Sequence, residues 1–336
     1  MRAVVLKEIG APENLIVEDV PIPEPQPGEV RVALKSAALN RRDVWITVGA
    51  YGRITLPSIG GSDGAGVIEA VGAGVEPAMI GREVVIYPAR DWGDDPRCGG
   101  KNFRVLGMPD QGTFADYICV PASDVEDKPG HLSWDEAAAI PLAGMTAWRA
   151  TVTHGEVKAG DKVLVTGIGG GCATYAMTWA LGHGAEVYVT SSSQEKIDGA
   201  LARGASGGVN YREDGWNKAL KEMSGGIDLI IDSAGGSGLN QTLDTLKNGG
   251  RYVFFGATLG DADTGLSMAK LFFKQIRIQG TTMGRPEEFR DMLAFVREHK
   301  VTPVVDQVVD IEDAVAAHRR LLDSAQTGNI VLHIAD

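Results

Sequence analysis

The sequence predicts an α/β protein of two domains, a compact, mostly antiparallel β domain and a doubly wound parallel sheet wrapped by helices. Three observations lead to this fold class. Residues 1–125 read as short strands separated by turn-forming glycines and prolines. From residue 161 onward, strand-like and helix-like segments alternate, which is typical of a parallel sheet covered by helices. The closing stretch 329–333 reads as a strand that returns to the first domain. We therefore expect one domain over 1–127 with 282–336, and a second domain over 128–281.

The strands of the first domain follow a proline-rich entry. Prolines alternate with other residues over 21–27 and run into Gly28, which interrupts regular structure. Residues 30–35 then alternate apolar and polar side chains, as in a half-buried strand. Short apolar runs predict further strands at 66–72, 84–87 and 114–120.

The second domain begins with a helix and continues as strand–helix units. Ser133 and Glu136 form a capping-box pattern ahead of an apolar run, which predicts a helix start. Apolar, β-rich runs predict strands at 162–166, 186–190, 227–231, 251–255 and 275–279. Helices are expected between them, at 174–181, 194–203 and 239–247.

Composition excludes several classes of partner. The chain of 336 residues has a net charge of −12, so it would repel nucleic acid and anionic membranes, and an anionic ligand needs a local cationic site. No apolar run reaches the roughly 20 residues of a membrane helix, and the N-terminus is charged too soon for a signal peptide. We expect a cytoplasmic protein that acts on a small-molecule substrate. Its three cysteines cannot form a disulfide framework or a four-cysteine metal site.

The strongest local pattern is a strand, a glycine turn and a helix start over residues 163–181. Free N–H groups at a helix N-terminus bind anions, and glycines let the backbone approach a pyrophosphate. The alternative is a glycine-rich turn without a ligand, but the second strand that follows favours a dinucleotide. The residues expected to contact it here are Gly167, Gly170, Gly171, Cys172 and Ala173, of which Cys172 contributes its backbone.

The end of the second strand distinguishes between the two nicotinamide dinucleotides. An NAD site usually places Asp or Glu there, on the ribose hydroxyls. Here Ser191, Ser192, Ser193 and Lys196 follow instead, and these side chains suit a 2′-phosphate. Tyr211, after the next short strand, would also reach that phosphate. We expect NADPH; the alternatives are that Lys196 is a solvated lysine and Tyr211 a packing residue.

With these motifs the chain resembles the medium-chain dehydrogenase/reductase superfamily over essentially its whole length. The resemblance implies a GroES-like β-barrel catalytic domain joined to a Rossmann domain, with the C-terminus returning to the first domain. Its landmarks, specific only in combination, are 30–32, 38–43, 60–66, 141–148, the phosphate loop and 249–251.

The resemblance also implies that the chain has lost zinc. Zinc-dependent members carry Cys and His-Glu ligands at positions where this sequence has Asn40, Ser62, Asp63 and Leu142. Zinc prefers thiolate, imidazole or carboxylate, so only Asp63 would serve. The structural-zinc lobe is replaced by residues 88–112 with one cysteine, Cys98. We expect no metal, and alcohol oxidation is disfavoured because an alkoxide would lack a Lewis acid.

Without zinc, the chain is similar to the quinone oxidoreductase and enoyl reductase branches, which pass a hydride from NADPH to an electron-poor acceptor. Tyr51 resembles the proposed proton donor of enoyl thioester reductases; the alternative is that it packs in a loop. Asn40 either orients the acceptor carbonyl or bonds its own turn. Arg41 and Arg42 either add positive potential or are solvated, and Asp63 is expected to be structural.

The family pattern assigns the nicotinamide side of the cofactor as well. Thr146 matches the residue under the nicotinamide, and backbone contacts are expected from Gly256, Ala257, Thr282 and Met283. A homodimer is expected through pairing of residues 271–279 across a two-fold axis, although a charged, exposed edge would look similar. Alternative functions are a zinc-type alcohol dehydrogenase and a non-catalytic NADPH-binding protein, either a sensor or crystallin-like.

Overall fold

The computed structural model describes residues 1–262 and 265–336, which form two compact units. The first unit comprises Met1–Met145 and Gly284–Asp336, and the second comprises Thr146–Met283. Residues 128–145, which the sequence placed in the second domain, lie in the first unit. No helix among the described residues is long and apolar enough to cross a membrane.

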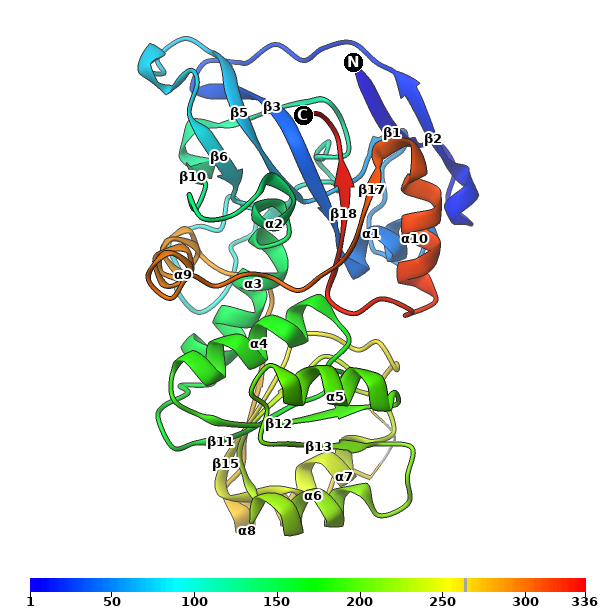
Figure 1. Cartoon of the computed structure of the whole chain (residues 1–336), viewed down its shortest axis with the longest axis vertical. Helices are drawn as coiled ribbons and strands as arrows, with labels where there is room; N and C mark the ends of the chain where they lie inside the picture. Colours follow the sequence, from blue (N-terminus) through cyan, green and yellow to red (C-terminus); the bar gives the residue numbers. More distant parts are fainter. Residues whose placement is uncertain (263–264) are drawn as a thin grey trace. The chain divides into compact units, whose positions relative to one another are not determined.

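The first unit is built around strand β3 (Glu29–Leu39), whose buried and half-buried residues alternate as predicted (Figure 1). It pairs antiparallel with β5 (Asp63–Val71), β9 (Tyr117–Pro121) and β18 (Asn329–His333). The last pairing brings the C-terminal segment back to this unit, as expected. The remaining strands are β1 (Arg2–Leu6), β2 (Leu15–Asp19), β4 (Ser58–Ile59), β6 (Glu83–Ile86), β7 (Ala89–Arg90), β8 (Arg104–Val105), β10 (Val125–Asp127) and β17 (Val305–Asp310).

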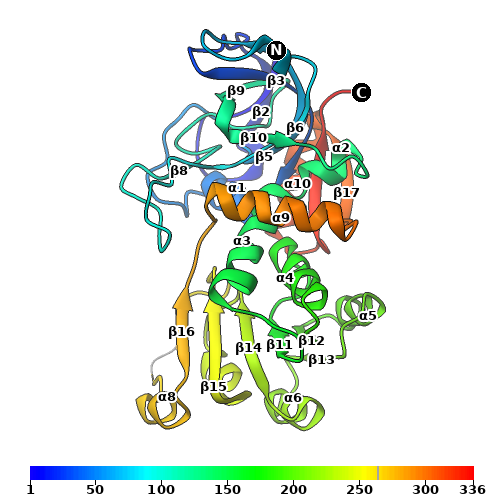
Figure 2. The ribbon, with the colours of Figure 1, turned by 90° about the vertical axis from the view of Figure 1, so that its left-hand side faces the viewer.

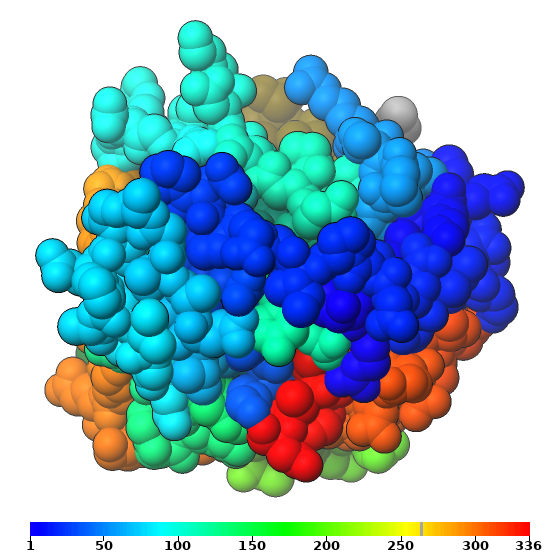
Figure 3. Space-filling model, turned by 90° about the horizontal axis from the view of Figure 1, so that it is seen from above, coloured from blue at the N-terminus to red at the C-terminus, as the bar shows by residue number. Residues whose placement is uncertain are grey.

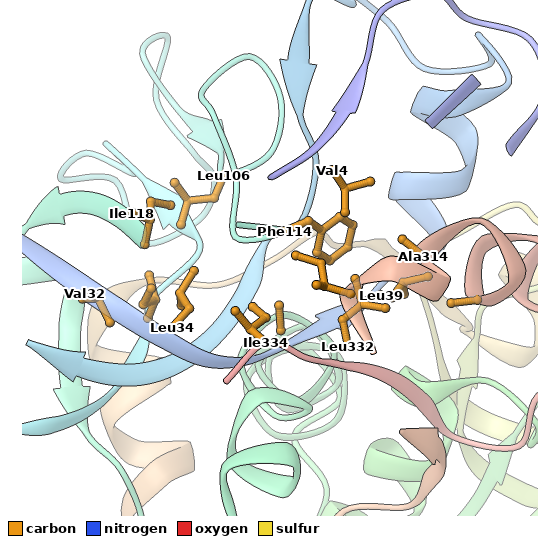
Figure 4. Packing of buried hydrophobic residues seen from close by; sticks show 14 of the residues in the cluster. Val4, Val32, Leu34, Leu39, Leu106, Phe114, Ile118, Ala314, Leu332 and Ile334 are labelled. Carbon is orange, nitrogen blue, oxygen red and sulfur yellow. The ribbon is translucent and has the colours of Figure 1, made fainter. Parts of the chain in front are cut away.

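Short helices and a packed core complete the first unit. Figure 4 shows the ring of Phe114 between Val4 and Leu39. Phe114 is fully buried, and its ring also meets the edge of His318 at 5.7 Å between centroids. The N-terminal strands and the C-terminal end meet on one face (Figure 3), where Arg2 Nη2 donates to the carbonyl of Ile334 at 2.7 Å. The α-helices are α1 (Arg41–Thr47), α2 (Trp134–Ala138), α3 (Pro141–Trp148, continuing across the unit boundary), α9 (Pro286–Glu298) and α10 (Ala314–Leu322).

The second unit is a parallel six-stranded sheet in the order β13-β12-β11-β14-β15-β16 (Figure 2). From the middle strand the chain steps outward to one edge and then to the other, which is the doubly wound arrangement. Its strands are β11 (Lys162–Val165), β12 (Glu186–Ser191), β13 (Gly207–Asn210), β14 (Ile227–Asp232), β15 (Leu246–Phe254) and β16 (Arg277–Gly280). Its α-helices are α4 (Gly171–Gly182), α5 (Gln194–Ala202), α6 (Trp216–Ser224), α7 (Leu239–Asp244) and α8 (Met268–Lys274).

Two predicted elements differ from the structure. The helix expected over 239–247 ends at Asp244, because Leu246 already pairs with Ile227 in the sheet. The segment 271–279, which was expected to pair across a two-fold axis, is helical up to Lys274. Ser267 starts that helix by accepting a hydrogen bond from the Lys270 N–H at 3.2 Å, which overrides the alternating pattern. The capping box at Ser133 and Glu136 is confirmed.

Candidate functional site

The phosphate loop connects β11 to α4 and brings its predicted residues together. Gly167 has a φ of 63°, which glycine adopts without strain. Gly170 precedes the first residue of α4, and no described side chain caps this helix. Such a first turn offers backbone N–H groups to an anion, and Gly171, Cys172 and Ala173 supply it here.

The polar residues at the end of β12 and just after it lie beside this loop. Thr190 Oγ1 accepts a hydrogen bond from the Gly167 N–H at 3.4 Å. Ser193 caps α5 by accepting from the Lys196 N–H at 3.4 Å, while the Ser193 N–H donates to Ser191 Oγ at 3.1 Å. A Cβ atom placed on Gly169 would lie 2.7 Å from Lys196 Nζ, so the ammonium group lies against the loop. Serine hydroxyls and a cation thus stand next to the glycine loop.

Tyr211 lies near these groups through its backbone, since its N–H donates to the Ser191 carbonyl at 3.2 Å. Its ring packs, partly buried, against a core cluster that includes Tyr188 and Leu220. The packing role considered for Tyr211 is therefore present in the structure.

Of the residues expected near the nicotinamide, four follow the carboxyl ends of β15 and β16, and Thr146 lies on α3. The Thr281 N–H donates to the Phe254 carbonyl at 2.9 Å, which joins the two strand ends. Thr146 Oγ1 lies 3.9 Å from the sulfur of Met283, and both residues are buried. Gly256 packs so closely that a Cβ atom there would lie 3.0 Å from the Ser233 carbonyl oxygen. In parallel sheets of this kind, the carboxyl ends of the strands form the ligand-binding edge.

Asp232, at the end of β14, was missed in the sequence. Its buried carboxylate accepts hydrogen bonds from Thr166 Oγ1 and from the hydroxyl of Tyr252. It also accepts from the N–H groups of Ala234 at 2.9 Å and Gly235 at 3.2 Å. Asp232 therefore shapes the loop after β14 at the same edge as the phosphate loop. An acidic residue at the carboxyl end of a mostly apolar strand was the only available signal.

The first unit holds the second set of candidate residues, at the start of α1. Asn40 precedes this helix, and its N–H donates to Asp43 Oδ2 at 2.7 Å. The Nδ2 atom of Asn40 donates to Asp63 Oδ2 at 2.8 Å, and the Leu142 N–H donates to Asp63 Oδ1 at 2.7 Å. Burial raises the pKa of Asp63 to about 8 and that of Asp43 to about 6.

Arg42 lies among the same segments, and it is buried, not solvated. Its Nη1 donates to Ser62 Oγ and to the Leu106 carbonyl, each at 2.6 Å, and its Nη2 donates to the Met108 carbonyl at 3.1 Å. The guanidinium also lies over the ring of Tyr51. Tyr51 and Asn40 are thus linked to one polar network in the first unit.

The groups at the zinc-ligand positions of relatives do not fit a zinc ion. Asp63 has both oxygens in hydrogen bonds, and Ser62 Oγ accepts from Arg42 while donating to the Leu106 carbonyl at 2.7 Å. Asn40 turns an amide N–H toward Asp63, and a guanidinium stands next to the cluster. Across the described residues, no group of three or more His, Cys, Asp or Glu side chains is placed to hold a metal.

Comparisons with known proteins match both units. The family model described as "Alcohol dehydrogenase GroES-like domain" matches residues 26–130, and the model described as "Zinc-binding dehydrogenase" matches residues 171–298. The zinc-type alcohol dehydrogenase-like protein YogA of Leptosphaeria maculans is 38% identical over 322 residues, which cover 91% of this chain and 89% of that protein. A quinone oxidoreductase of Homo sapiens is 29% identical over 99% of this chain and 97% of its own length. The solved structure of an NAD-dependent alcohol dehydrogenase is similar with a TM-score of 0.95 at 39% identity, covering 100% of both chains.

Proposed function

Because the chain belongs to the medium-chain dehydrogenase/reductase superfamily and is a quinone oxidoreductase-like member, we propose that it is a zinc-independent reductase of quinones or α,β-unsaturated carbonyl compounds. Members of this family are oxidoreductases whose Rossmann domain binds a nicotinamide cofactor. NADPH is the proposed cofactor, and it would supply the hydride.

One observation carries this proposal: hydrogen-bonding groups stand where zinc-dependent relatives hold the metal. Asn40, Ser62 and Asp63 are bonded to one another or to Arg42 and the backbone. Such groups stabilise charge on an enolate or quinol oxygen, but they offer no Lewis acid for an alkoxide. The acceptor must therefore already be short of electrons.

Two side chains would act on the acceptor. Asn40 would orient the acceptor carbonyl through its amide, and Tyr51 would give its hydroxyl proton to the reduced substrate after the hydride has arrived. Hydride and proton together account for the two-electron reduction. The Arg42 guanidinium over the ring of Tyr51 would stabilise the negative charge that develops on the phenol oxygen.

The test is NADPH oxidation by pure protein with a panel of quinones and enones. We expect turnover with some of these acceptors, and a Tyr51→Phe variant that still binds NADPH but turns over more slowly. Absence of NADPH oxidation with every acceptor would refute the proposal. If NADPH still bound tightly in that case, a non-catalytic role would be favoured.

The choice of NADPH over NADH rests on Lys196 and on the serines at the end of β12, because the strand end itself carries no Asp or Glu that would repel a 2′-phosphate. Replacing Lys196 with Ala should raise the KM for NADPH about 10-fold or more and leave the KM for NADH nearly unchanged. Lys218→Ala is the control, because Lys218 is an exposed lysine on α6 of the same unit. A wild-type preference for NADH would overturn this assignment.

A zinc-type alcohol dehydrogenase is the second candidate, favoured by the names of the similar proteins. Such an enzyme requires zinc ligands, and the hydrogen-bonded groups of Asn40, Ser62 and Asp63 do not provide that set. Alcohol oxidation together with about one zinc per chain would establish it in place of the reductase.

We further propose a homodimer through the β16 edge of the second unit. Among the described residues, β16 pairs with β15 on one side and is unpaired on the other (Figure 2). Next to this edge, α8 exposes Met268, Phe272 and Phe273, with exposed fractions of 67%, 62% and 75%. An apolar patch beside an open strand edge indicates a surface that is buried when the protein assembles. A second copy of the chain would bury it.

A further inference from the structure

We propose that Asp232 is a positioning residue for the dinucleotide cofactor. It fixes the loop after β14 (residues 233–236), and that loop sets where the nicotinamide-side loop (residues 256–260) lies relative to the phosphate loop. This role rests on the cofactor contacts proposed for Gly167, Gly256 and Ala257, and it does not depend on which acceptor is reduced.

All four hydrogen bonds that the structure gives the Asp232 carboxylate converge on a side chain that is only 3% exposed. Oδ1 accepts from Thr166 Oγ1 and from the Ala234 N–H at 2.9 Å. Oδ2 accepts from the Tyr252 hydroxyl and from the Gly235 N–H at 3.2 Å. The two main-chain donors are successive residues of the loop after β14, so this one side chain determines the path of the chain as it leaves the sheet.

The loop after β14 packs between the other two loops. Strands β11, β14 and β15 are neighbours in the sheet, so the loops at their carboxyl ends are neighbours as well (Figure 2). A Cβ atom placed on Gly167 would lie 3.4 Å from Ser233 Oγ, and one on Gly256 would lie 3.0 Å from the Ser233 carbonyl oxygen. Ser233 therefore packs against a residue of the phosphate loop and against one of the nicotinamide-side loop.

The nicotinamide-side loop is largely exposed, and main-chain hydrogen bonds tie it to the loop after β14. The Leu259 N–H donates to the Ala234 carbonyl at 2.9 Å, and the Gly236 N–H donates to the Gly260 carbonyl at 3.0 Å. Because Asp232 holds the N–H of Ala234, a shift of the loop after β14 would move the nicotinamide-side loop with it.

The phosphate loop has anchors of its own that do not involve Asp232. The Ile168 N–H donates to the Thr190 carbonyl at 3.0 Å, and the Gly167 N–H donates to Thr190 Oγ1 at 3.4 Å, so β12 holds this loop. The loss of the Asp232 carboxylate should then displace the nicotinamide-side loop and leave the phosphate loop in place. Only a ligand that reaches both loops would be affected.

Asp232→Asn tests this role with almost no change of shape. An amide has one oxygen and one NH2 group, so in either orientation its NH2 group faces the N–H of Ala234 or the N–H of Gly235. The hydroxyls of Thr166 and Tyr252 can turn to accept, but a main-chain N–H cannot. One N–H therefore loses its acceptor, and the loop after β14 must move to find another.

Two ligands distinguish the spanning contact from the phosphate contact: NADP⁺, which would reach both loops, and 2′,5′-ADP, which lacks the nicotinamide half. Isothermal titration calorimetry without an acceptor gives both Kd values. We expect Asp232→Asn to raise the Kd for NADP⁺ about 10-fold and to change the Kd for 2′,5′-ADP by less than about 2-fold, because a displaced loop must be reordered only by the spanning ligand. If the wild type prefers NAD⁺, then NAD⁺ and ADP take their places.

Asp228→Asn is the matched control, because Asp228 lies at the other end of β14. Its carboxylate accepts from the Lys162 N–H at 2.9 Å and pairs with Lys247 Nζ at 2.7 Å, so its loss also removes a main-chain bond. The ratio of the two Kd values should remain that of the wild type in this variant. An unchanged ratio in Asp232→Asn, or an equal change in both variants, would overturn the proposal.

Two substitutions of Thr166 test the same link with the Asp232 side chain intact, and they decide the question if Asp232→Asn does not fold. Thr166 Oγ1 donates to Asp232 and accepts from the Ser233 N–H at 3.3 Å. Thr166→Val removes both bonds and should shift the ratio of Kd values in the same direction by about 3-fold. Thr166→Ser keeps the hydroxyl and should retain the wild-type ratio. Equal ratios in these two variants would contradict the proposal.

The binding measurements separate this role from the proposed reaction. If the ratio changes as expected but no quinone or enone is reduced, Asp232 positions the cofactor and the proposed function fails. If acceptors are reduced but the ratio does not change, the proposed function stands and the role of Asp232 is refuted.

Discussion

The guanidinium of Arg42 lies over the ring of Tyr51, with Cζ 5.1 Å from the ring centroid. The same group donates to Ser62 Oγ and to the carbonyls of Leu106 and Met108. One buried cation thereby connects α1, the entry to β5 and the segment that replaces the structural-zinc lobe. Its planar fork satisfies three acceptors that lie 20 to 66 residues from Arg42 along the chain.

Arg42→Lys should therefore destabilise the protein although it keeps the charge. An ammonium group cannot span Ser62 and both carbonyls, so at least one buried carbonyl loses its donor. We expect the free energy of unfolding to fall by about 2–4 kcal/mol, measured by urea denaturation. Arg212→Lys, at an exposed position, should change it by less than about 0.5 kcal/mol. Equal stability of both variants would show that the branched hydrogen bonding of the Arg42 guanidinium contributes nothing to the free energy of unfolding.

The sequence predicted the features that depend on local pattern. The capping box at Ser133, the glycine turn at Gly167 and the alternation of β3 each follow from neighbouring residues. The burial of Arg42 does not, because its two carbonyl acceptors, Leu106 and Met108, lie more than sixty residues away along the chain. The pairing of Asn40 with Asp63 is likewise a tertiary contact, with no spacing rule to indicate it.

Chelation should leave the enzyme active. Ser62 Oγ and both oxygens of Asp63 are held in hydrogen bonds, and Arg42 would repel a divalent cation. We expect unchanged NADPH-dependent turnover after prolonged dialysis against a strong chelator, and zinc well below one equivalent per chain by elemental analysis. A zinc-dependent alcohol dehydrogenase treated in parallel should lose activity. Loss of activity that zinc alone restores would contradict the prediction.

Phe273→Asp should separate the proposed dimer. Phe273 is 75% exposed on α8, so an aspartate there causes no strain in the single chain but introduces a charge into an apolar interface. Light scattering after size exclusion should show the molecular mass falling to that of one chain. Leu201→Asp, at a 40% exposed position on α5 of the same unit, should retain the mass of two chains. A wild type that is already monomeric would exclude the dimer.

His318 should make the protein less stable below neutral pH. It is buried, its Nδ1 bonds the Ala314 carbonyl at 2.7 Å, and burial lowers its pKa to about 4 from an ordinary 6.5. Between these values the unfolded chain binds a proton that the folded chain does not, so stability falls as the pH falls through this window. Urea denaturation at several pH values should give a difference in unfolding free energy between the wild type and His318→Asn. That difference should change only between the two pKa values, about 4 and 6.5. A constant difference would mean that His318 does not titrate differently on folding.

Asp63 should have the opposite dependence over a higher range. Its pKa is raised from 3.8 to about 8, so between these values the folded protein keeps a proton that the unfolded chain has released. Stability therefore falls as the pH rises through the window, with a slope that approaches about 1.4 kcal/mol per pH unit, and it levels off above the upper value. Asp63→Asn cannot titrate at this position. Its free energy of unfolding should therefore increase relative to that of the wild type as the pH rises from 5 to 8. Asp43, whose pKa is raised to about 6, titrates within the same window but is present in both proteins and largely cancels from the comparison. If the difference in unfolding free energy between the two proteins stayed flat with pH, the buried carboxyl of Asp63 would be ionised throughout this range.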